Sequence, residues 1–255
     1  MANRKTDFTE AIWRSETDLD AWINGLSSLM RSGWSHLTKR RIRSFNAALA
    51  RSVAHLLPTE EWNQALPLAE RYADGEASAD DVRAAHYSLS SQHTDPDGPP
   101  YTEVWSLGCA RNVVLFSLHA DNGHRIQTIH TAAMKWSASS AVDALLDRRL
   151  LNSRNNVQPV EHARRATQRQ HVRLLRDIFG NPFRPAPFSS HWRTDTVVAI
   201  AREMYASRDF SAVPILADAL QDAGCEDAGI LDHCRAPGGV HVRGCWVVDL
   251  VLGKT

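Results

Sequence analysis

The chain has 255 residues, of which 43% are hydrophobic and 23% are charged, so it can bury a core as one large or two small domains. Its 29 basic and 29 acidic residues cancel, which argues against a general binder of nucleic acid or anionic membranes, because such proteins usually carry a net basic field. Its longest apolar runs are much shorter than the roughly 20 residues that a membrane-spanning helix needs.

The N-terminus lacks the apolar stretch of a secretory signal. The four cysteines of this chain are too few for a disulfide framework. Both features predict a protein of the reducing cytoplasm, and the short apolar runs predict that it is not a membrane protein.

Residues 1–93 are predicted to form an N-terminal helical region. Apolar residues recur there at three- and four-residue spacings, the pattern of amphipathic helices. The predicted helices cover residues 13–30, 42–57 and 59–72, and a fourth is capped by Ser78. Residues 94–100, with three prolines and a glycine, are predicted to be a linker.

Residues 101–255 are predicted to form a second helical region. Its first half holds two apolar stretches, 104–119 and 126–151, that favour closely packed helices. A basic helix is predicted next, over 158–179. The helices that follow are expected to have Thr194 and Ser211 as N-caps, the second with Pro214 in its first turn, then a short helix around 228–234 and a last one over 240–252. The whole pattern predicts an all-α fold, either a multi-helix bundle or a short helical array.

Two long strings in the last third of the chain are similar to a family signature. They are Leu174-Leu175-Arg176-Asp177-Ile178-Phe179-Gly180-Asn181-Pro182-Phe183-Arg184-Pro185 and His241-Val242-Arg243-Gly244-Cys245-Trp246-Val247-Val248-Asp249-Leu250. With shorter matches near the N-terminus, they resemble an uncharacterised family of helical proteins best known from planctomycete bacteria. The resemblance implies a C-terminal module over 174–254 in an intracellular helical protein, and it brings no activity, cofactor or catalytic residue with it.

Four residues of this module suggest a metal site. Cys225, Cys234, His241 and Cys245 can supply a Cys₃His set for tetrahedral zinc, with His233 as an alternative nitrogen ligand. Their spacings do not match the tight Cys-x₂-Cys pattern of zinc motifs, and free cysteines are often simply buried. We therefore expect no cofactor by default, and zinc is the one that these residues suggest.

Arginines are concentrated between residues 148 and 176, where Glu161 is the single acidic residue. They are Arg148, Arg149, Arg154, Arg164, Arg165, Arg169, Arg173 and Arg176. A basic helix of this kind can follow nucleic-acid phosphates, with Arg164, Arg165 and Arg169 at its centre. The alternative, which we favour on net charge, is that the acidic residues between 203 and 232 neutralise this helix within the molecule.

Catalysis has little support in the sequence. Cys225, His233, Cys234 and His241 contain the residue types of a Cys–His nucleophile, but sequence proximity does not establish the required geometry. No nucleophile elbow, phosphate-binding glycine loop or His-Glu-x-x-His pair is present. We lean against an enzyme.

Protein interaction is the function that the sequence favours. The chain has eight tryptophans, a residue type enriched at interface hot spots as well as in helical cores. Arg184, between two prolines, is the best single candidate for an exposed recognition element. We expect an interaction or scaffolding component with an unknown protein partner; a nucleic-acid-associated protein ranks second, and a zinc-supported or Cys/His catalytic site third.

Overall fold

Every regular element in the described part of the chain is a helix. The computed structural model describes residues 9–15, 19–31, 39–57, 59–91, 104–118 and 157–254. Within these residues the predicted all-α class is confirmed. None of their helices is both long and apolar enough to cross a lipid bilayer.

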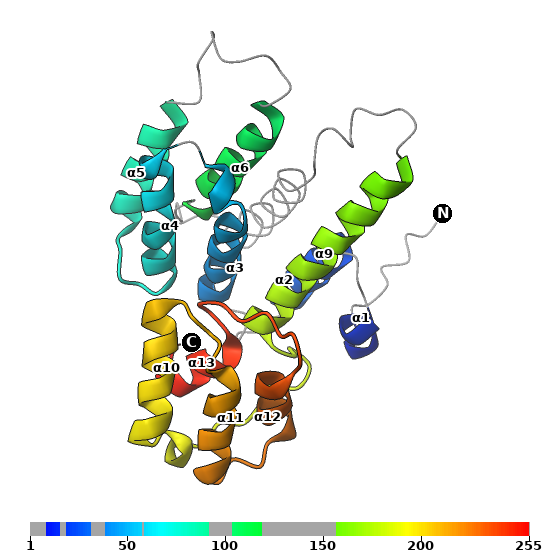
Figure 1. Cartoon of the computed structure of the whole chain (residues 1–255), viewed down its shortest axis with the longest axis vertical. Helices are drawn as coiled ribbons and strands as arrows, with labels where there is room; N and C mark the ends of the chain where they lie inside the picture. Colours follow the sequence, from blue (N-terminus) through cyan, green and yellow to red (C-terminus); the bar gives the residue numbers. More distant parts are fainter. Residues whose placement is uncertain are drawn as a thin grey trace. The chain divides into compact units, whose positions relative to one another are not determined.

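The helices carry the labels of Figure 1. They are α1 (Glu10–Ser15), α2 (Leu19–Arg31), α3 (Lys39–Ser52), α4 (Glu60–Ala73), α5 (Ala79–Ser91), α6 (Val104–Ser117), α9 (Val157–Phe179), α10 (Asp195–Ser207), α11 (Val213–Asp222), α12 (Ala228–Arg235) and α13 (Trp246–Leu252). Two short 3₁₀ turns add Ala54–Leu56 and Ser190–Trp192. The apolar pattern predicted over 13–30 thus belongs to two helices, α1 and α2. The stretch predicted as a helix over 126–151 lies outside the described residues.

The chain divides into two units, residues 1–172 and 173–255. The division falls inside α9, next to the start of the predicted C-terminal module at Leu174. The predicted linker, 94–100, lies outside the described residues. Because α6, which comes after the linker, packs on α3, α4 and α5, which precede it, the helices on both sides of the linker belong to the first unit.

In the first unit, α3 and α4 pack along each other and α6 contacts both (Figure 1). The apolar face between them buries Ile42, Phe45, Leu49, Trp62 and Leu66. Two ion pairs join α3 to α4 and its C-cap: Arg51 Nε lies 2.8 Å from Glu70 Oε1, and Arg40 Nη2 lies 2.8 Å from Asp74 Oδ1. Because Glu70 is buried, its pairing with Arg51 provides the compensation that an ionised carboxylate needs in a core.

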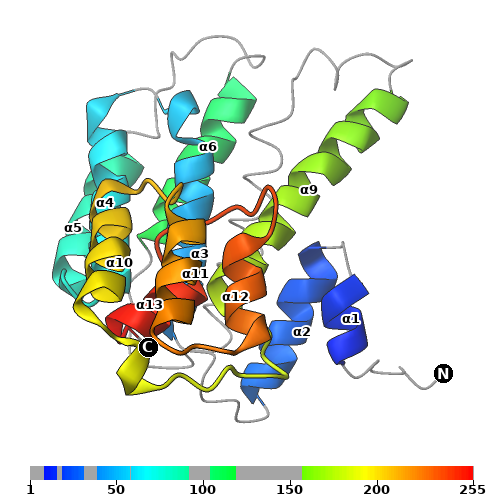
Figure 2. The ribbon, with the colours of Figure 1, turned by 60° about the horizontal axis from the view of Figure 1, so that its bottom comes forward.

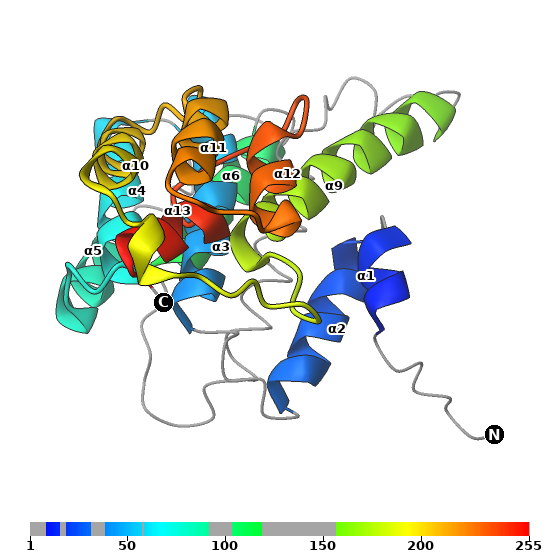
Figure 3. The same ribbon diagram turned by 90° about the horizontal axis from the view of Figure 1, so that it is seen from below.

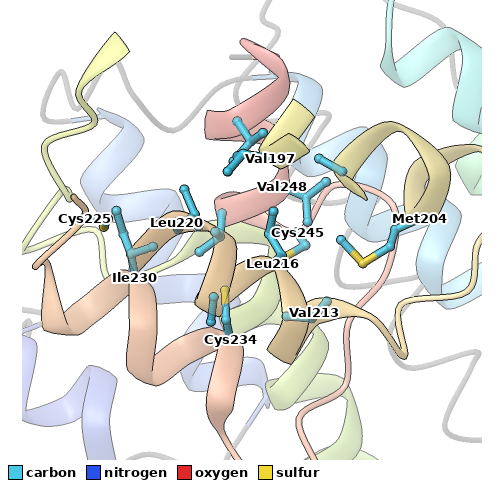
Figure 4. Close-up of a cluster of buried hydrophobic side chains, with 14 of the residues drawn as sticks. Val197, Met204, Val213, Leu216, Leu220, Cys225, Ile230, Cys234, Cys245 and Val248 are labelled. Carbon is cyan, nitrogen blue, oxygen red and sulfur yellow. The ribbon is translucent and has the colours of Figure 1, made fainter. Parts of the chain in front are cut away.

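In the second unit, α10 to α13 surround a hydrophobic cluster of their own (Figure 2). α10 packs on α13 and α11, and α11 packs on α12. The close-up in Figure 4 shows the members from α10 to α13 pointing at one another, among them Val197, Met204, Leu216, Leu220, Ile230 and Val248. Each large apolar side chain buried in this way contributes about 1.5–3 kcal/mol, so the four short helices are held together chiefly by this cluster.

Local signals in the sequence define the ends of these helices. Thr194 is the N-cap of α10, as predicted, and its side chain accepts a hydrogen bond from the Val197 N–H. Gly253, in a left-handed conformation with φ of 69°, ends α13. The guanidinium of Arg193 donates to the carbonyls of Leu250 and Val251, at 2.8 and 3.1 Å, and so adds hydrogen-bond donors at the C-terminal end of this helix.

Two predicted helix starts are wrong. The N-cap of α11 is Ala212 and not Ser211, because the Ser211 N–H bonds to the Asp209 side chain in the preceding turn; Pro214 does lie in the first turn of the helix. The last helix starts at Trp246 and not near residue 240. The Val242 N–H is bonded to the side chain of Asp177, and Gly244 has a φ of 96°, so residues 240–245 form a loop.

Replacing Thr194 with alanine should destabilise the second unit by about 1 kcal/mol, because the Val197 N–H loses its acceptor. The free energy of unfolding, measured by urea denaturation, provides the check. Thr196→Ala is the matched control: Thr196 is exposed inside the same helix, where alanine has the better helix propensity. Equal losses in the two variants would contradict a capping role for Thr194.

Candidate metal centre

Four side chains of the second unit bring their polar atoms to one point. They are Asp177, His233, His241 and Cys245, and one ligand atom from each lies within 4.8 Å of the other three. Asp177 Oδ1 is 3.2 Å from His233 Nε2 and 2.8 Å from His241 Nδ1. The Cys245 Sγ is 3.3 Å from His233 Nε2 and 3.8 Å from His241 Nδ1.

Each of the four residues comes from a different place in the fold. Asp177 lies in the last turn of α9 and His233 in the last turn of α12, whose end lies beside that of α9 (Figure 3). His241 lies in the loop before α13, and Cys245 is the N-cap of that helix. The cluster therefore joins α9, α12 and α13 at one point.

Two effects disfavour a charged Asp177 side chain at its position. The C-terminal turn of a helix carries partial negative charge, which repels a carboxylate. The Asp177 side chain is also only 2% exposed, and burial penalises its charged form. Burial raises the pKa of Asp177, but hydrogen bonds from His233 and His241 and the charges of these rings outweigh it, and the pKa falls below its usual value.

Both oxygens of the Asp177 carboxylate are engaged. Oδ1 faces the two histidine nitrogens, while Oδ2 accepts a hydrogen bond from the Val242 N–H at 3.0 Å. The loop backbone thus fixes the rotation of the carboxylate. As a result Oδ1 is held toward His233, His241 and the sulfur of Cys245.

Cys245 is fully buried, with 0% of its surface exposed. Burial raises the pKa of its thiol well above the usual value, and the nearby charge of Asp177 raises it further, although the Val248 backbone N–H acts in the opposite direction. Without a metal the sulfur is therefore a neutral thiol. A metal ion at this point would reverse that, since a coordinating thiol is deprotonated outright.

The two imidazole rings are packed in place. The His233 ring lies 5.1 Å from the Trp246 ring and 5.0 Å from the His241 ring, measured between centroids. Gly239 approaches His241 so closely that an added Cβ would lie 2.7 Å from Nε2 of the ring. His233 is 18% and His241 9% exposed, so the cluster lies just under the surface.

The predicted zinc ligands are only partly brought together. His241 and Cys245 belong to the cluster, with His233, which the sequence suggested as the alternative nitrogen ligand. Cys225 and Cys234 lie instead in the hydrophobic cluster of the unit, at 0% and 2% exposure (Figure 4). Burial raises the pKa of both thiols, that of Cys234 to about 12, as expected for cysteines in apolar packing.

The sequence did not indicate Asp177 as a ligand. It is 64 residues away from His241 along the chain, so no spacing motif connects them. One signal was available: Asp177 lies at the end of a helix, directly after Arg176, with the apolar residues Leu175, Ile178 and Phe179 all buried around it. A carboxylate in such a position needs a compensating partner.

The other predicted site residues lie elsewhere. Arg165 and Arg169 are exposed on α9 and Arg164 is half-buried, while Arg148 lies outside the described residues. Arg184 is exposed in the turn after α9. A nucleic-acid role for the basic helix stays a prediction.

Several residues of the acidic segment 203–232 have local partners. Asp218 pairs with Arg235 at 2.6 Å. Asp209 accepts from the Ser211 N–H, and Asp227 from the Ile230 N–H. These three carboxylates thus serve contacts within the second unit, and neutralisation of the basic helix by this segment stays a prediction.

The cluster fits a metal site better than a Cys–His nucleophile. A nucleophilic cysteine needs a lowered pKa and access for its substrate, whereas Cys245 is fully buried and the pKa of its thiol is raised. Four donor atoms around one point are instead the arrangement of a closed metal site.

No protein-family model, curated protein or solved structure matches this chain. The resemblance to a planctomycete family therefore stays an expectation from the sequence, and the function is argued from the cluster itself.

Proposed function

We propose that residues 173–255 form a zinc-binding module in which Asp177, His233, His241 and Cys245 hold one Zn²⁺ as a structural ion. The observation that carries the proposal is the convergence of one carboxylate oxygen, two imidazole nitrogens and one sulfur within 4.8 Å. We further propose that the module belongs to a protein-interaction or scaffolding component of the cytoplasm, where reducing conditions keep a cysteine ligand available.

The spacing of the donors supports tetrahedral coordination. Zinc bonds of about 2.0–2.3 Å place neighbouring ligand atoms about 3.3–3.8 Å apart in a tetrahedron. The separations of His233 from Asp177 and Cys245 are 3.2 and 3.3 Å, and that of His241 from Cys245 is 3.8 Å. The shortest, 2.8 Å between His241 and Asp177, has to widen by about half an ångström, which a small ring movement allows.

Charge also supports a divalent ion. The Asp177 carboxylate and a Cys245 thiolate contribute one negative charge each, and the two histidines bind as neutral rings. With Zn²⁺ the set is neutral, which suits a site where Asp177 and Cys245 are buried. An uncompensated charge at the same depth would cost several kcal/mol.

The donor types favour zinc over the harder divalent ions. Calcium and magnesium take oxygen ligands almost exclusively, whereas this set offers two nitrogens and a sulfur. Four protein ligands also fill the tetrahedral shell. Catalytic zinc sites keep one position for water, so this donor set supports a structural role.

Metal analysis tests the proposal. Protein purified without chelator and dialysed against zinc should retain about one equivalent per chain. After exchange to cobalt, the chain should show the strong visible absorption of tetrahedral Co²⁺ and a thiolate charge-transfer band, and azide should leave both unchanged. Retention below about a tenth of an equivalent would overturn zinc binding. A cobalt spectrum that responds to azide would instead indicate an open coordination position and overturn the structural role.

Replacing Gly239 with alanine should weaken zinc binding by about 10–100-fold, because the new Cβ would displace the His241 ring from its position. Competition with a chromophoric chelator measures the affinity. Gly238→Ala is the matched control: with a φ of 67° it strains the same turn, but an added Cβ meets nothing within 4 Å. Similar losses of affinity in both variants would show that the turn as a whole matters and not the approach to His241.

A further inference from the structure

We infer that the zinc ion is a clasp: it fastens segment 236–245 to the end of α9, and its removal releases this segment locally while the helical cluster of α10 to α13 stays folded. This inference rests on the proposed zinc site. It adds a regulation of that site, in which metal availability controls the order of one surface segment.

Segment 236–245 has little apolar burial to hold it. Residues 236–239 are exposed and 240–243 are half-buried, and residues 236–244 contribute nothing to the hydrophobic cluster. Two of its backbone hydrogen bonds are local turns, Gly239 N–H to the Ala236 carbonyl and Cys245 N–H to the Val242 carbonyl. The segment therefore depends on side-chain contacts for its position.

Two of the contacts that hold the segment are made to Asp177. His241 Nδ1 lies 2.8 Å from its Oδ1, and the Val242 N–H donates to its Oδ2. A third tether is the guanidinium of Arg243, which stacks 4.4 Å from the centre of the Tyr205 ring on α10. Each of these interactions is modest by itself, whereas a metal bound through His241 and Cys245 anchors the segment near its middle and at its C-terminal end.

The rest of the unit has its own means of staying folded. The hydrophobic cluster draws its members from α10 to α13 and the turns between them, and Cys245 is its only member among the four proposed ligands. Its helices keep their caps at Thr194, Asp227 and Gly253 whether or not a metal is bound. The apo state should therefore open at the clasp and not throughout the unit.

Thermodynamic linkage between zinc binding and opening of segment 236–245 gives the expected size of the zinc effect. A ligand that binds only the closed state lowers the equilibrium constant for opening by the factor 1 + [L]/Kd. With free zinc at about 100 times its Kd, the amides that exchange through opening of the clasp should exchange about a hundredfold more slowly. The amides of Gly239, Val242 and Cys245 are the reporters, because each donates a hydrogen bond inside the closed segment or to Asp177.

Hydrogen exchange of the full chain, read by mass spectrometry with zinc and with excess chelator, tests the inference. We expect peptides within 236–245 to exchange about a hundredfold more slowly with zinc, while α10 and α11 stay protected in both states. His241→Ala should remove the zinc effect in 236–245, and His191→Ala, an exposed histidine of the same unit, should keep it. If His241→Ala does not fold, the comparison of the wild-type chain with and without chelator still decides.

Two outcomes would overturn the clasp and leave the zinc site standing. In the first, about one equivalent of zinc binds but exchange in 236–245 is the same with zinc and with chelator. In the second, chelation also removes protection from α10 and α11, so the metal supports the whole unit. Failure to bind zinc at all would overturn the proposed function itself, and the inference with it.

Discussion

Replacing His241 with alanine is expected to weaken zinc binding by about a hundred to a thousandfold. Structural zinc sites of four ligands bind with about 10–16 kcal/mol, so one ligand accounts for about 3–4 kcal/mol, which is two to three orders of magnitude in affinity. His241 also contacts the Asp177 carboxylate, so its removal weakens the position of a second ligand. Competition titration with a chelator of known affinity provides the measurement.

The controls separate a lost ligand from a damaged fold. His191→Ala removes an exposed histidine of the same unit and should leave zinc affinity unchanged. Cys245→Ser should weaken zinc binding and remove the thiolate-to-cobalt charge-transfer band, whereas Cys225→Ala should keep the band, since Cys225 lies in the hydrophobic cluster outside the four-ligand group. A band that survives in Cys245→Ser would show that another cysteine is the sulfur ligand.

The helices could be predicted because their signals are local. Apolar periodicity marks the buried faces of α3 and α4, and Thr194, Gly75 and Gly253 mark helix ends by capping and by left-handed backbone. The start of α13 could not be predicted in the same way. Residues 240–245 are apolar enough to continue the helix, but a hydrogen bond from Val242 to Asp177, far away in sequence, holds them in a loop.

The candidate site could be predicted only in part, because only part of its signals are local in the sequence. His241 and Cys245 are four residues apart and attract notice as a pair. Cys225 and Cys234 look equally suitable in the sequence, because nothing local distinguishes a cysteine buried in apolar packing from one that faces other ligands. Asp177 completes the cluster from another helix, and only the tertiary fold brings it there.

Asp177 also shows how such sites can be recognised. An acidic residue in the last turn of a helix, buried among apolar neighbours, conflicts with both the helix dipole and the cost of burying charge. Conflicts of this kind in an otherwise consistent sequence concentrate at functional sites. Asp177, His241 and Cys245 also fall inside the two strings that carry the resemblance to the planctomycete family.

A second large effect is expected from His171, in the first unit. Its side chain is 1% exposed, and neither ring nitrogen has a hydrogen-bond partner among the residues that the structure describes. Burial lowers the pKa of His171 from 6.5 to about 4, so the ring stays neutral in the folded protein near pH 7. In the unfolded chain the same ring takes up a proton as the pH falls below 6.5.

The sign of the pH dependence follows from this difference. Above pH 6.5 His171 is neutral in both the folded and the unfolded state, so it does not affect the pH dependence of stability. Between pH 6.5 and 4 the unfolded state binds more protons than the folded state, so the free energy of unfolding falls as the pH falls. The loss reaches about 3 kcal/mol at the lower end of this window. Urea denaturation at pH 7 and pH 4.5 measures it, and His171→Leu should remove this part of the slope.

The matched control is Gln170→Leu, which places the same side chain at the neighbouring exposed position and should keep the wild-type slope. His171→Leu should also be more stable than the wild type at pH 7, by about 1–3 kcal/mol, because two unpaired ring nitrogens no longer have to be buried. The two effects are separable, since the gain at pH 7 tests the missing hydrogen-bond partners and the lost slope tests the titration. Equal slopes in His171→Leu and the wild type would mean that acid weakens the fold through other groups.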